Sequence, residues 1–359
     1  MPLSLAIIGL PNVGKSTLFN ALTKNNVLAA NYPFATIEPN VGIVPVPDMR
    51  LTKLAELCHP EKIIPATVTF VDIAGLVRGA SEGQGLGNKF LTNIRECQAI
   101  CQVVRVFSDP NVVHVDDKVD ANSDIETINT ELILADLATV DNRLARLGSE
   151  LKANPKLASL QSVLEKTKDG LDAGKLAGAF LSAEECEEIR DLQLLTTKPF
   201  IMVFNLDEAQ LGDHELKTRL QTIVAPCPSV FLCAKVEAEL MELSPSESAE
   251  LLLELGQEQS GLDSLAEVGF TTLGLQTFLT AGPKEVRAWT IRQGDTAPQA
   301  AGVIHTDFEK GFIKAQIVSF NDLMEAGSEA AAKASGKLRL EGKDYVMQDG
   351  DVVEFRFNV

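Results

Sequence analysis

The sequence predicts an α/β protein with a mostly parallel sheet, an inserted helical hairpin and a small α+β domain at the C-terminal end. Short apolar runs alternate with helical patterns in the first third of the chain, which is typical of a parallel sheet covered by helices. A helical block interrupts this alternation at about residues 120–195, and short strand-like runs fill the tail.

The predicted sheet strands are short, β-rich runs with few polar residues, which suits strands buried on both faces. They lie at residues 3–8, 41–46, 66–71, 101–107, 200–204 and 229–233. Helical patterns at residues 15–23 and 88–99 separate the first of these strands. We therefore expect helices on both sides of a parallel sheet.

The helical block contains three segments, at residues 123–152, 155–171 and 182–195. Apolar residues recur three and four apart in the first segment, and Ser123, with Glu126 three residues later, is its expected N-cap. A crossover between parallel strands needs only about a dozen residues. The length therefore favours an insert over ordinary crossover helices.

The tail is expected to form its own domain, residues 276–359, after a nucleotide-binding domain of residues 1–275 that the insert interrupts. Its strand-like runs lie at residues 287–291, 312–320, 337–340 and 352–357. A helical run near residues 323–334 is the clear exception among them.

Composition limits the classes of function. The 359 residues carry a net charge of -18, so bulk electrostatics do not attract nucleic acid; DNA is not an expected partner, and RNA would need a local basic patch. No signal peptide or membrane-spanning run is apparent, so we expect a cytoplasmic protein. The six cysteines lack zinc-binding spacing, which favours buried free thiols.

Residues 9–16 match the phosphate-binding pattern G-x-x-x-x-G-K-[ST], between a predicted strand and a predicted helix. Gly9 and Gly14 allow a tight loop whose backbone N–H groups bind phosphate oxygens, aided by the helix dipole. Lys15 neutralises the β- and γ-phosphates, and the Ser16 hydroxyl suits magnesium. The sequence thus predicts a P-loop nucleotide hydrolase.

Two further segments, one with Asp72 and Gly75 and one with Thr36, point to a G-domain type of P-loop protein. Asp72 ends the strand at residues 66–71, where a carboxylate can hold Mg²⁺ through a water, and the N–H of Gly75 can sense the γ-phosphate. Thr36 lies in the loop before the strand at residues 41–46, where a switch threonine binds magnesium. Either residue alone would be weak evidence; the P-loop upstream strengthens both.

The expected base site departs from the guanine-binding pattern N-K-x-D. Asn205 is present, but Leu206 replaces the lysine and Glu208 the aspartate that accepts hydrogen bonds from guanine N1–H and N2–H. The segment Cys233-Ala234-Lys235, at the end of the strand at residues 229–233, is placed like the last base-contacting loop. The guanine clamp is therefore not intact.

These motifs together resemble the YchF (Obg-like) ATPases, a branch of the Obg group of translation-factor-class P-loop proteins, over nearly the whole chain. The matching segments are residues 11–17, 31–39, 72–77, 83–89, 205–208 and 355–359. Residues 305–312 also resemble the core of a TGS domain, a ubiquitin-like β-grasp module.

The resemblance implies a preference for ATP over GTP and association with the ribosome, through ribosomal RNA or protein. It also implies base contact by Leu206 and nucleotide binding by Asn12, Val13, Gly14, Lys15, Ser16 and Thr17. The expected partners are ATP, magnesium and the ribosome, without a membrane, and the expected state is a monomer.

The attacking water needs an orienting group, because Leu76 occupies the place where many relatives carry glutamine. His114, in the loop after the strand at residues 101–107, is the best replacement, and the resemblance points to the same residue. A plain surface histidine is the alternative. Asn12 can also help to hold potassium near the phosphates.

Three functions remain open from sequence. The first is slow ATP hydrolysis coupled to a switch. The second is a nucleotide-gated binding module whose hydrolysis is incidental. The third is a GTPase of the Obg group.

Overall fold

The computed structural model describes residues 3–24, 41–73, 86–109, 119–151, 154 and 157–358. The chain divides into two compact units. The first comprises Met1–Ile43 and Thr69–Leu265, and the second comprises Val44–Val68 and Ala266–Val359.

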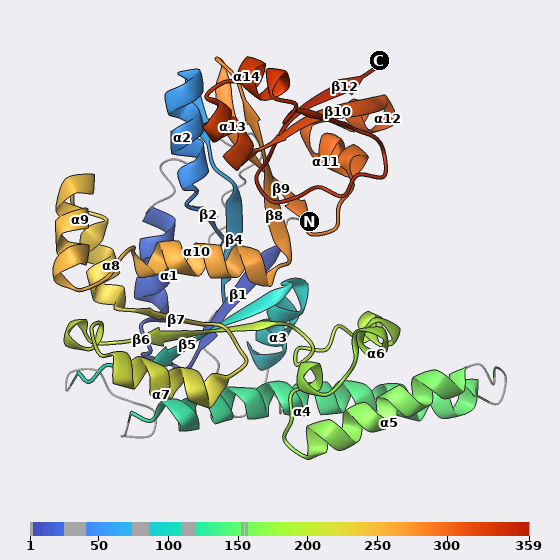
Figure 1. Cartoon of the computed structure of the whole chain (residues 1–359). Helices are drawn as coiled ribbons and strands as arrows, with labels where there is room; N and C mark the ends of the chain where they lie inside the picture. The colour runs from blue at the N-terminus through green and yellow to red at the C-terminus, as the bar shows by residue number, and fades with distance from the viewer. Residues whose placement is uncertain are drawn as a thin grey trace. The chain divides into compact units, whose positions relative to one another are not determined.

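The first unit is built on a six-stranded sheet in the order β2-β4-β1-β5-β6-β7 (Figure 1). Its strands are β1 (Ser4–Gly9), β2 (Val41–Pro45), β4 (Thr67–Asp72), β5 (Ala99–Arg105), β6 (Phe200–Asn205) and β7 (Ser229–Leu232). The pairs β1–β4, β1–β5, β5–β6 and β6–β7 are parallel. Every residue of β1, β5 and β6 is buried, as strands covered on both faces require.

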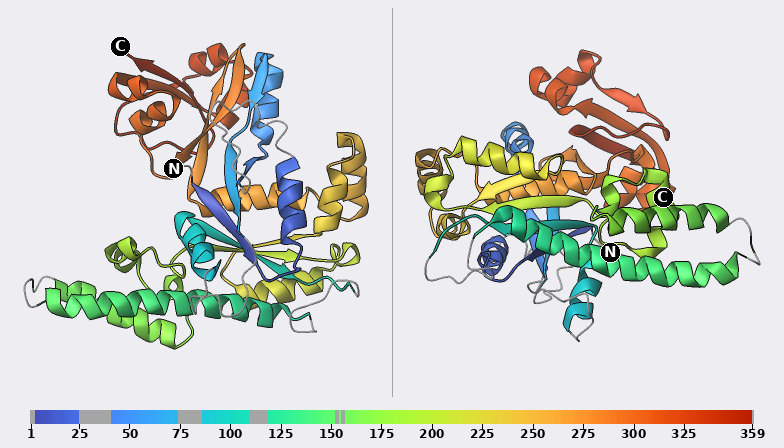
Figure 2. Two further views of the ribbon diagram at one scale, coloured as in Figure 1. Left: turned by 180° about the vertical axis from the view of Figure 1, so that it is seen from behind. Right: turned by 90° about the horizontal axis from the view of Figure 1, so that it is seen from below.

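Helices lie on both sides and at the edge of this sheet (Figure 2). They are α1 (Lys15–Lys24), α3 (Leu86–Glu96), α7 (His214–Val224), α8 (Ala234–Leu240), α9 (Pro245–Glu254) and α10 (Gly261–Thr272), which runs on into the second unit. Helix α1 packs against α8, which brings the loop after β1 close to the loop after β7. The predicted α/β fold class is confirmed.

The long connection between the neighbouring strands β5 and β6 forms the predicted helical hairpin. Helices α4 (Ala121–Glu150) and α5 (Ala158–Asp172) lie side by side around their own apolar cluster, which includes Val140, Leu147 and Leu164 (Figure 1). The carboxylate of Asp136 fixes the return of the chain: it accepts the backbone N–H groups of Leu195 and Thr196 at 3.0 and 2.7 Å.

Two details of the insert were predicted wrongly. The N-cap of α4 is Asp120, whose carboxylate accepts the N–H groups of Asn122 and Ser123, so the helix begins before Ser123. The single helix expected at residues 182–195 is instead α6 (Ala183–Glu188), followed by a 3₁₀ turn (Arg190–Leu192). Gln193, with φ 49°, ends the helical path in the left-handed region.

The second unit contains a mixed sheet in the order β11-β10-β12-β8-β9-β3. Its strands are β3 (Lys62–Ile64), β8 (Leu275–Ala281), β9 (Glu285–Arg292), β10 (Phe312–Ser319), β11 (Arg339–Glu341) and β12 (Asp351–Phe357). Helices α11 (Ala297–Ile304) and α12 (Thr306–Lys310) pack on it, and the core includes Phe278, Phe312 and Phe355. The α+β character of the tail matches the prediction; the TGS assignment stays a prediction.

The helical run predicted near residues 323–334 is broken in two. Helix α13 (Phe320–Ala326) ends at Gly327, which has φ 72°, and α14 (Glu329–Ala334) starts again with Ser328 as its N-cap. Only glycine adopts the left-handed conformation without steric cost, so the break is encoded by Gly327.

Residues 44–68 belong to the second unit, although the sequence predicts them within the nucleotide-binding domain. Helix α2 (Met49–Cys58) contacts β8, β9 and α13, and β3 pairs with β9 in parallel. Arg50 joins this segment to the tail: its guanidinium donates to Asp48, to Asp349 at 2.7 Å and to Thr277 Oγ1 at 2.9 Å. The domain boundary at 275/276 stays a prediction.

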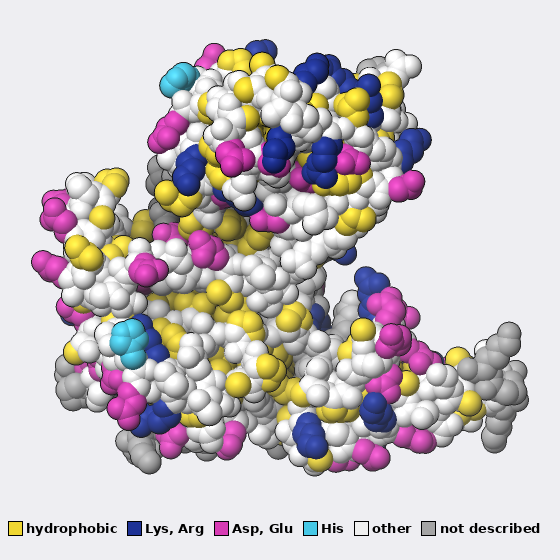
Figure 3. Space-filling model, viewed as in Figure 1, with side chains coloured by type: hydrophobic (Ala, Val, Ile, Leu, Met, Phe, Trp, Pro, Cys, Tyr) yellow, Lys and Arg dark blue, Asp and Glu magenta, His cyan; other side chains and the backbone are white. Residues whose placement is uncertain are grey.

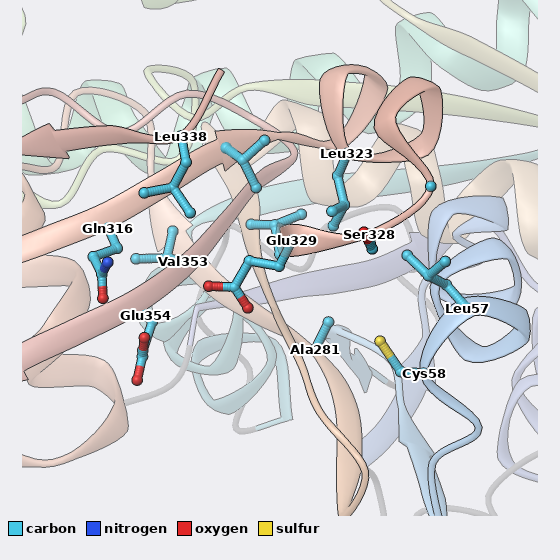
Figure 4. A pocket seen from close by; sticks show the side chains of 13 residues that line it. Leu57, Cys58, Ala281, Gln316, Leu323, Ser328, Glu329, Leu338, Val353 and Glu354 are labelled. Carbon is cyan, nitrogen blue, oxygen red and sulfur yellow. The ribbon is translucent and has the colours of Figure 1, made fainter. Parts of the chain in front are cut away.

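A cavity of about 210 Å³ lies in the second unit (Figure 4). Apolar and polar side chains line it, among them Leu57, Leu338, Val353, Cys58, Gln316, Glu329 and Glu354. Burial and the Glu329 carboxylate raise the pKa of the Cys58 thiol, so it stays protonated at neutral pH. Among the described residues that line this cavity, none is a lysine or an arginine.

Within the described ranges, no helix combines the length and the apolar character that crossing a membrane would require.

Candidate nucleotide site

The predicted phosphate loop joins the carboxyl end of β1 to the N-terminus of α1. Gly14 has φ 91° and Asn12 has φ 62°, so the backbone turns through two left-handed positions. A Cβ at Gly14 would collide with Asn205 Nδ2, and a Cβ at Gly9 would approach the carbonyl oxygen of Val103 to 2.8 Å. Only glycine fits at either place, because the loop lies directly against β5 and β6.

The loop leads directly into α1, since the carbonyl of Gly14 accepts the N–H of Leu18 at 2.9 Å. The first N–H groups of a helix have no partner inside the helix and carry the positive end of its dipole. Ser16 and Thr17 are exposed at this end, whereas Val13 is buried. The arrangement suits an anion such as a phosphate group.

Lys15 and Asp72 meet beside this loop. The ammonium of Lys15 donates to Asp72 Oδ1 at 2.5 Å, and the two side chains are 9% and 21% exposed. Asp72 ends β4 next to β1, and the pairing of these strands places Ile7 opposite Asp72. The structure thus brings together a cation for phosphate and a carboxylate oxygen, a ligand type that magnesium prefers.

Asn205 holds the loops of the site together. Its Nδ2 donates to the carbonyl of Val13 at 2.9 Å, and its Oδ1 accepts the N–H of Ala234 at 2.9 Å. The side chain is 4% exposed. Asn205 therefore spans the gap between the phosphate loop and the loop after β7, a role that its expected contact with the nucleotide did not anticipate.

A cavity of about 740 Å³ extends from the phosphate loop toward the loops after β5, β6 and β7. Among the residues predicted for the site, Gly14, Thr17, Asn205, Leu206, Glu208 and Ala234 line it. Leu206 is 1% exposed and presents no hydrogen-bonding group from its side chain. The cavity is large enough for a nucleoside attached to the phosphates.

Asp207, Cys233 and Lys235, neighbours of the predicted base-site residues, also line it. Other lining residues were not predicted from sequence: Phe107, Ser108, Asp109, Ala209, Ala238 and Leu255. The loop at residues 106–109 follows β5 and supplies an aromatic wall. The sequence contained one signal for the loop at residues 106–109, namely Arg105 at the end of an apolar strand. A buried charge needs hydrogen-bond partners, and the residues that follow the strand can supply them.

Thr36, Gly75 and His114 lie outside the described residues. Their predicted roles stay predictions. In the part of the chain that the structure describes, no group of three or more His, Cys, Asp or Glu residues is arranged to hold a metal ion by itself.

A thiol that lines the cavity and a buried acid on α8 both have raised pKa values. Burial raises the pKa of the Cys233 thiol, so this lining residue is a neutral thiol at pH 7. Burial also raises the pKa of Glu237, on α8, to about 7. Glu237 accepts the N–H of Gly261 at 2.7 Å and thereby fixes the start of α10.

Two family models match the chain. One, described as a 50S ribosome-binding GTPase, matches residues 4–143. The other, for the C-terminal part of YchF GTPases and described as a protein of unknown function, matches residues 275–358.

Whole-length relatives are also found. The protein named "Ribosome-binding ATPase YchF" is 53% identical in Escherichia coli O157:H7 and 50% identical in Bacillus subtilis, and each match covers all of both chains. A solved structure titled "Structure of the Schizosaccharomyces pombe YchF GTPase" is 38% identical, with a TM-score of 0.87 over 99% of this chain and 97% of that one.

A GTP-binding protein from Pyrococcus horikoshii OT3, 20% identical with a TM-score of 0.61, shares the fold. The identities over complete chains, together with the two family models, decide the relationship. The chain is a member of the YchF family.

Proposed function

We propose that this chain hydrolyses ATP to ADP and phosphate, with magnesium, and acts as a nucleotide switch that associates with the ribosome. The observation that supports this most directly is the continuous cavity from Gly14 and Thr17 to Leu206 and Ala234. One end lies at the N-terminus of α1, the helix that begins with Lys15, and the other offers apolar walls for a base.

The phosphate end suits a triphosphate. Lys15 supplies a positive charge, and the left-handed Gly14 turns the loop toward the start of α1. Ser16, Asp72 and Thr36 would hold magnesium through oxygen atoms, a donor set that fits this hard cation. When bound, magnesium neutralises charge on the phosphate oxygens. Asn12, exposed in the loop, is the proposed ligand for a potassium ion.

The base end favours adenine over guanine. Guanine selection uses the aspartate of N-K-x-D as the acceptor for N1–H and N2–H; here the longer Glu208 stands in its place, and the apolar Leu206 replaces the lysine. The curated relatives are named ATPases, while the Schizosaccharomyces pombe structure is titled a GTPase. We favour ATP because the lysine and the aspartate of the guanine pattern are both absent.

The test is a titration of nucleotide-free protein with fluorescent ATP and GTP analogues in magnesium buffer, each competed with unlabelled nucleotide. ATP should bind clearly more tightly. A double variant, Leu206→Lys with Glu208→Asp, rebuilds the N-K-x-D pattern and should shift the preference toward GTP. Tighter GTP binding by the unaltered protein would overturn the ATPase proposal and leave a GTPase.

The second unit is the better candidate for the ribosome contact. It carries 13 Lys and Arg against 16 Asp and Glu, so most of the net charge of -18 falls on the first unit. Lys and Arg side chains gather over this unit on the face shown in Figure 3. Lys310 and Lys314 are exposed residues of the same unit.

Further basic residues of the tail include Lys284, Arg287, Arg292, Lys337, Arg339 and Lys343. Three of these are engaged within the unit: Arg287 stacks on Trp289, Lys337 pairs with Asp322, and Arg339 pairs with Glu341. Charge reversal at Lys310 and Lys314 should reduce co-sedimentation with ribosomes and leave ATP affinity unchanged. Unaltered co-sedimentation would exclude this patch as the contact.

The incidental-hydrolysis alternative predicts a different pattern. If only nucleotide binding matters, a His114 variant that still binds ATP should retain its nucleotide-dependent association with the ribosome. A Lys15 variant, which does not bind ATP, should lose it. We further expect a cytoplasmic monomer, without a membrane or DNA as partner.

A further inference from the structure

Arg105 is a charged side chain in an otherwise apolar position. It ends β5, between β1 and β6 in the middle of the sheet, and it is 2% exposed. Burying a charge is costly unless hydrogen bonds compensate it. The groups that bind Arg105 therefore indicate what the residue stabilises.

Two of these groups lie in the four residues that follow. The Nε of Arg105 donates to the carbonyl of Phe107 at 3.2 Å, and Nη2 donates to the carbonyl of Asp109 at a longer 3.4 Å. The guanidinium carbon lies 4.4 Å from the centroid of the Phe107 ring. A planar guanidinium can stack on an aromatic ring and donate at its edges simultaneously, which a lysine ammonium cannot do.

The same loop is fixed from its other side by the end of β6. The N–H groups of Val106 and Phe107 donate to the carbonyl of Asn205 at 2.9 and 3.1 Å. The N–H of Ser108 donates to Asp207 Oδ2 at 3.0 Å. Residues 106–109 are thus held between Arg105 and the segment predicted to contact the base.

Phe107, Ser108 and Asp109 line the same cavity as Leu206. The guanidinium of Arg105 lies against the Phe107 ring, and this contact limits the positions that the ring can take. An aromatic wall that is already in place lowers the entropic cost of binding a ligand.

We propose that Arg105 is a positioning residue for the base of the nucleotide, which acts by holding Phe107 and the loop at residues 106–109 as a preformed wall. The inference rests on the proposed function, because it presupposes a nucleotide in this cavity. Its basis is the set of bonds from Arg105 to Phe107 and Asp109, both of which line the cavity.

The test compares two ligands that share the phosphate end and differ at the base end: ATP and inorganic tripolyphosphate. Arg105→Lys keeps the charge and removes the stacking fork. The variant should bind ATP about tenfold more weakly, because the Phe107 ring and its loop are then no longer preformed and must be ordered when the ligand binds. Its affinity for tripolyphosphate should stay within about twofold of the unaltered protein, since the phosphate loop is intact.

Arg143→Lys is the matched control. Arg143 lies on α4 of the helical insert, pairs with Glu150 at 2.9 Å and does not line the cavity. The Arg143→Lys variant makes the same chemical change away from the cavity. It should leave the affinities for ATP and for tripolyphosphate unaltered. Thermal unfolding of both variants shows whether the fold is retained.

A double-mutant cycle with Phe107→Leu tests whether Arg105 acts through the ring. In the Phe107→Leu background, Arg105→Lys should weaken ATP binding by less than about threefold, because the ring it positions is gone. Equal effects in both backgrounds would contradict action through Phe107.

The outcomes separate this inference from the proposed function. If the unaltered protein prefers ATP to tripolyphosphate and Arg105→Lys keeps that preference, the role of Arg105 is overturned and the proposed function stands. If Arg105→Lys abolishes tripolyphosphate binding as well, Arg105 is a general structural residue and the inference also falls. If the unaltered protein binds ATP and tripolyphosphate equally tightly, the cavity does not bind the base. Both the proposed function and the role of Arg105 are then contradicted.

Discussion

The two units each contain a cavity next to a left-handed glycine, and the two cavities suit different ligands. In the first unit Gly14 precedes α1, and Lys15 and Thr17 come directly after it. In the second unit Gly327 ends α13, and the nearby lining groups include the carboxylates of Glu329 and Glu354. The first cavity suits an anion at its phosphate-loop end only, since Asp109, Asp207 and Glu208 line the rest of it, whereas the second has no lysine or arginine among its described lining residues.

The comparison shows that a glycine turn acquires its chemistry from the element that it joins. At the carboxyl ends of parallel strands, loops meet the N-termini of helices, where backbone N–H groups are available to anions. The cavity of the second unit lies against a mixed sheet, and none of its described lining residues is a lysine or an arginine (Figure 4). The same backbone conformation therefore predicts phosphate binding in only one of the two places.

Removal of the Lys15 ammonium should have the largest effect. Lys15→Ala is expected to weaken ATP binding by about 100-fold or more, since a buried charge-assisted contact is worth several kcal/mol. Isothermal titration of the nucleotide-free protein measures it. Glu329→Ala in the other cavity is the control and should bind ATP normally; a comparable weakening there would break the contrast between the cavities.

The buried carboxyl of Glu237 should make the free energy of unfolding of the first unit depend on pH. Burial raises its pKa from 4.5 to about 7, so between these pH values the folded chain keeps a proton that the unfolded chain has released. The contribution of Glu237 to the free energy of unfolding is therefore present below pH 4.5 and is lost as the pH rises to about 7. The decrease should be at most about 3 kcal/mol.

Glu237→Gln removes this titration and retains an oxygen acceptor for the N–H of Gly261. Urea unfolding at pH 5 and pH 8 compares the two proteins. The free energy of unfolding of the unaltered protein should fall between pH 5 and pH 8 by more than that of the variant. Parallel pH profiles would show that Glu237 titrates normally.

Substitution of His114 should affect turnover without affecting affinity. His114→Ala is expected to lower the rate of ATP hydrolysis at least about tenfold, because no glutamine follows Gly75 to orient the attacking water. Single-turnover hydrolysis and ATP titration measure the two quantities separately. Unchanged turnover would remove His114 from the mechanism.

The smallest expected effect concerns the second unit alone. Arg50→Met removes the hydrogen bonds to Asp349 and Thr277 and should lower the stability of this unit by about 1–2 kcal/mol. Nucleotide affinity should not change. Thermal unfolding, followed through the single Trp289, reports on this unit; a decrease in ATP affinity would show that the two units depend on each other.

Much of the first unit could be predicted from sequence because its signals are local. The phosphate loop, the buried strands and the paired helices of the insert each occupy a continuous stretch whose pattern can be interpreted by itself. The breaks at Gln193 and Gly327 were not predicted, since left-handed positions leave little trace in apolar periodicity. The sequence predicted Ser123 as the N-cap of α4, whereas the structure has Asp120 there. Serine and aspartate both suit an N-cap, so the pattern alone does not choose between them.

What could not be predicted depends on pairing between distant segments. Asn205 had a suitable side chain for a base, but its contacts with Val13 and Ala234 follow from the order of the strands. Phe107 lines the cavity because Arg105 and Asn205 bind the loop around it. The membership of residues 44–68 in the second unit rests on β3 and Arg50, whose partners lie more than 200 residues later in the chain.

That separation sets an order of events during synthesis. Arg50 emerges long before Asp349, 299 residues later in the chain, and β3 likewise precedes its partner strand β9. At about 5–20 residues per second, the early segment waits roughly 15–60 s for Asp349. The strand β3 therefore passes a period without its partner strand β9, with both of its edges unpaired, and unpaired edges are templates for pairing with another chain.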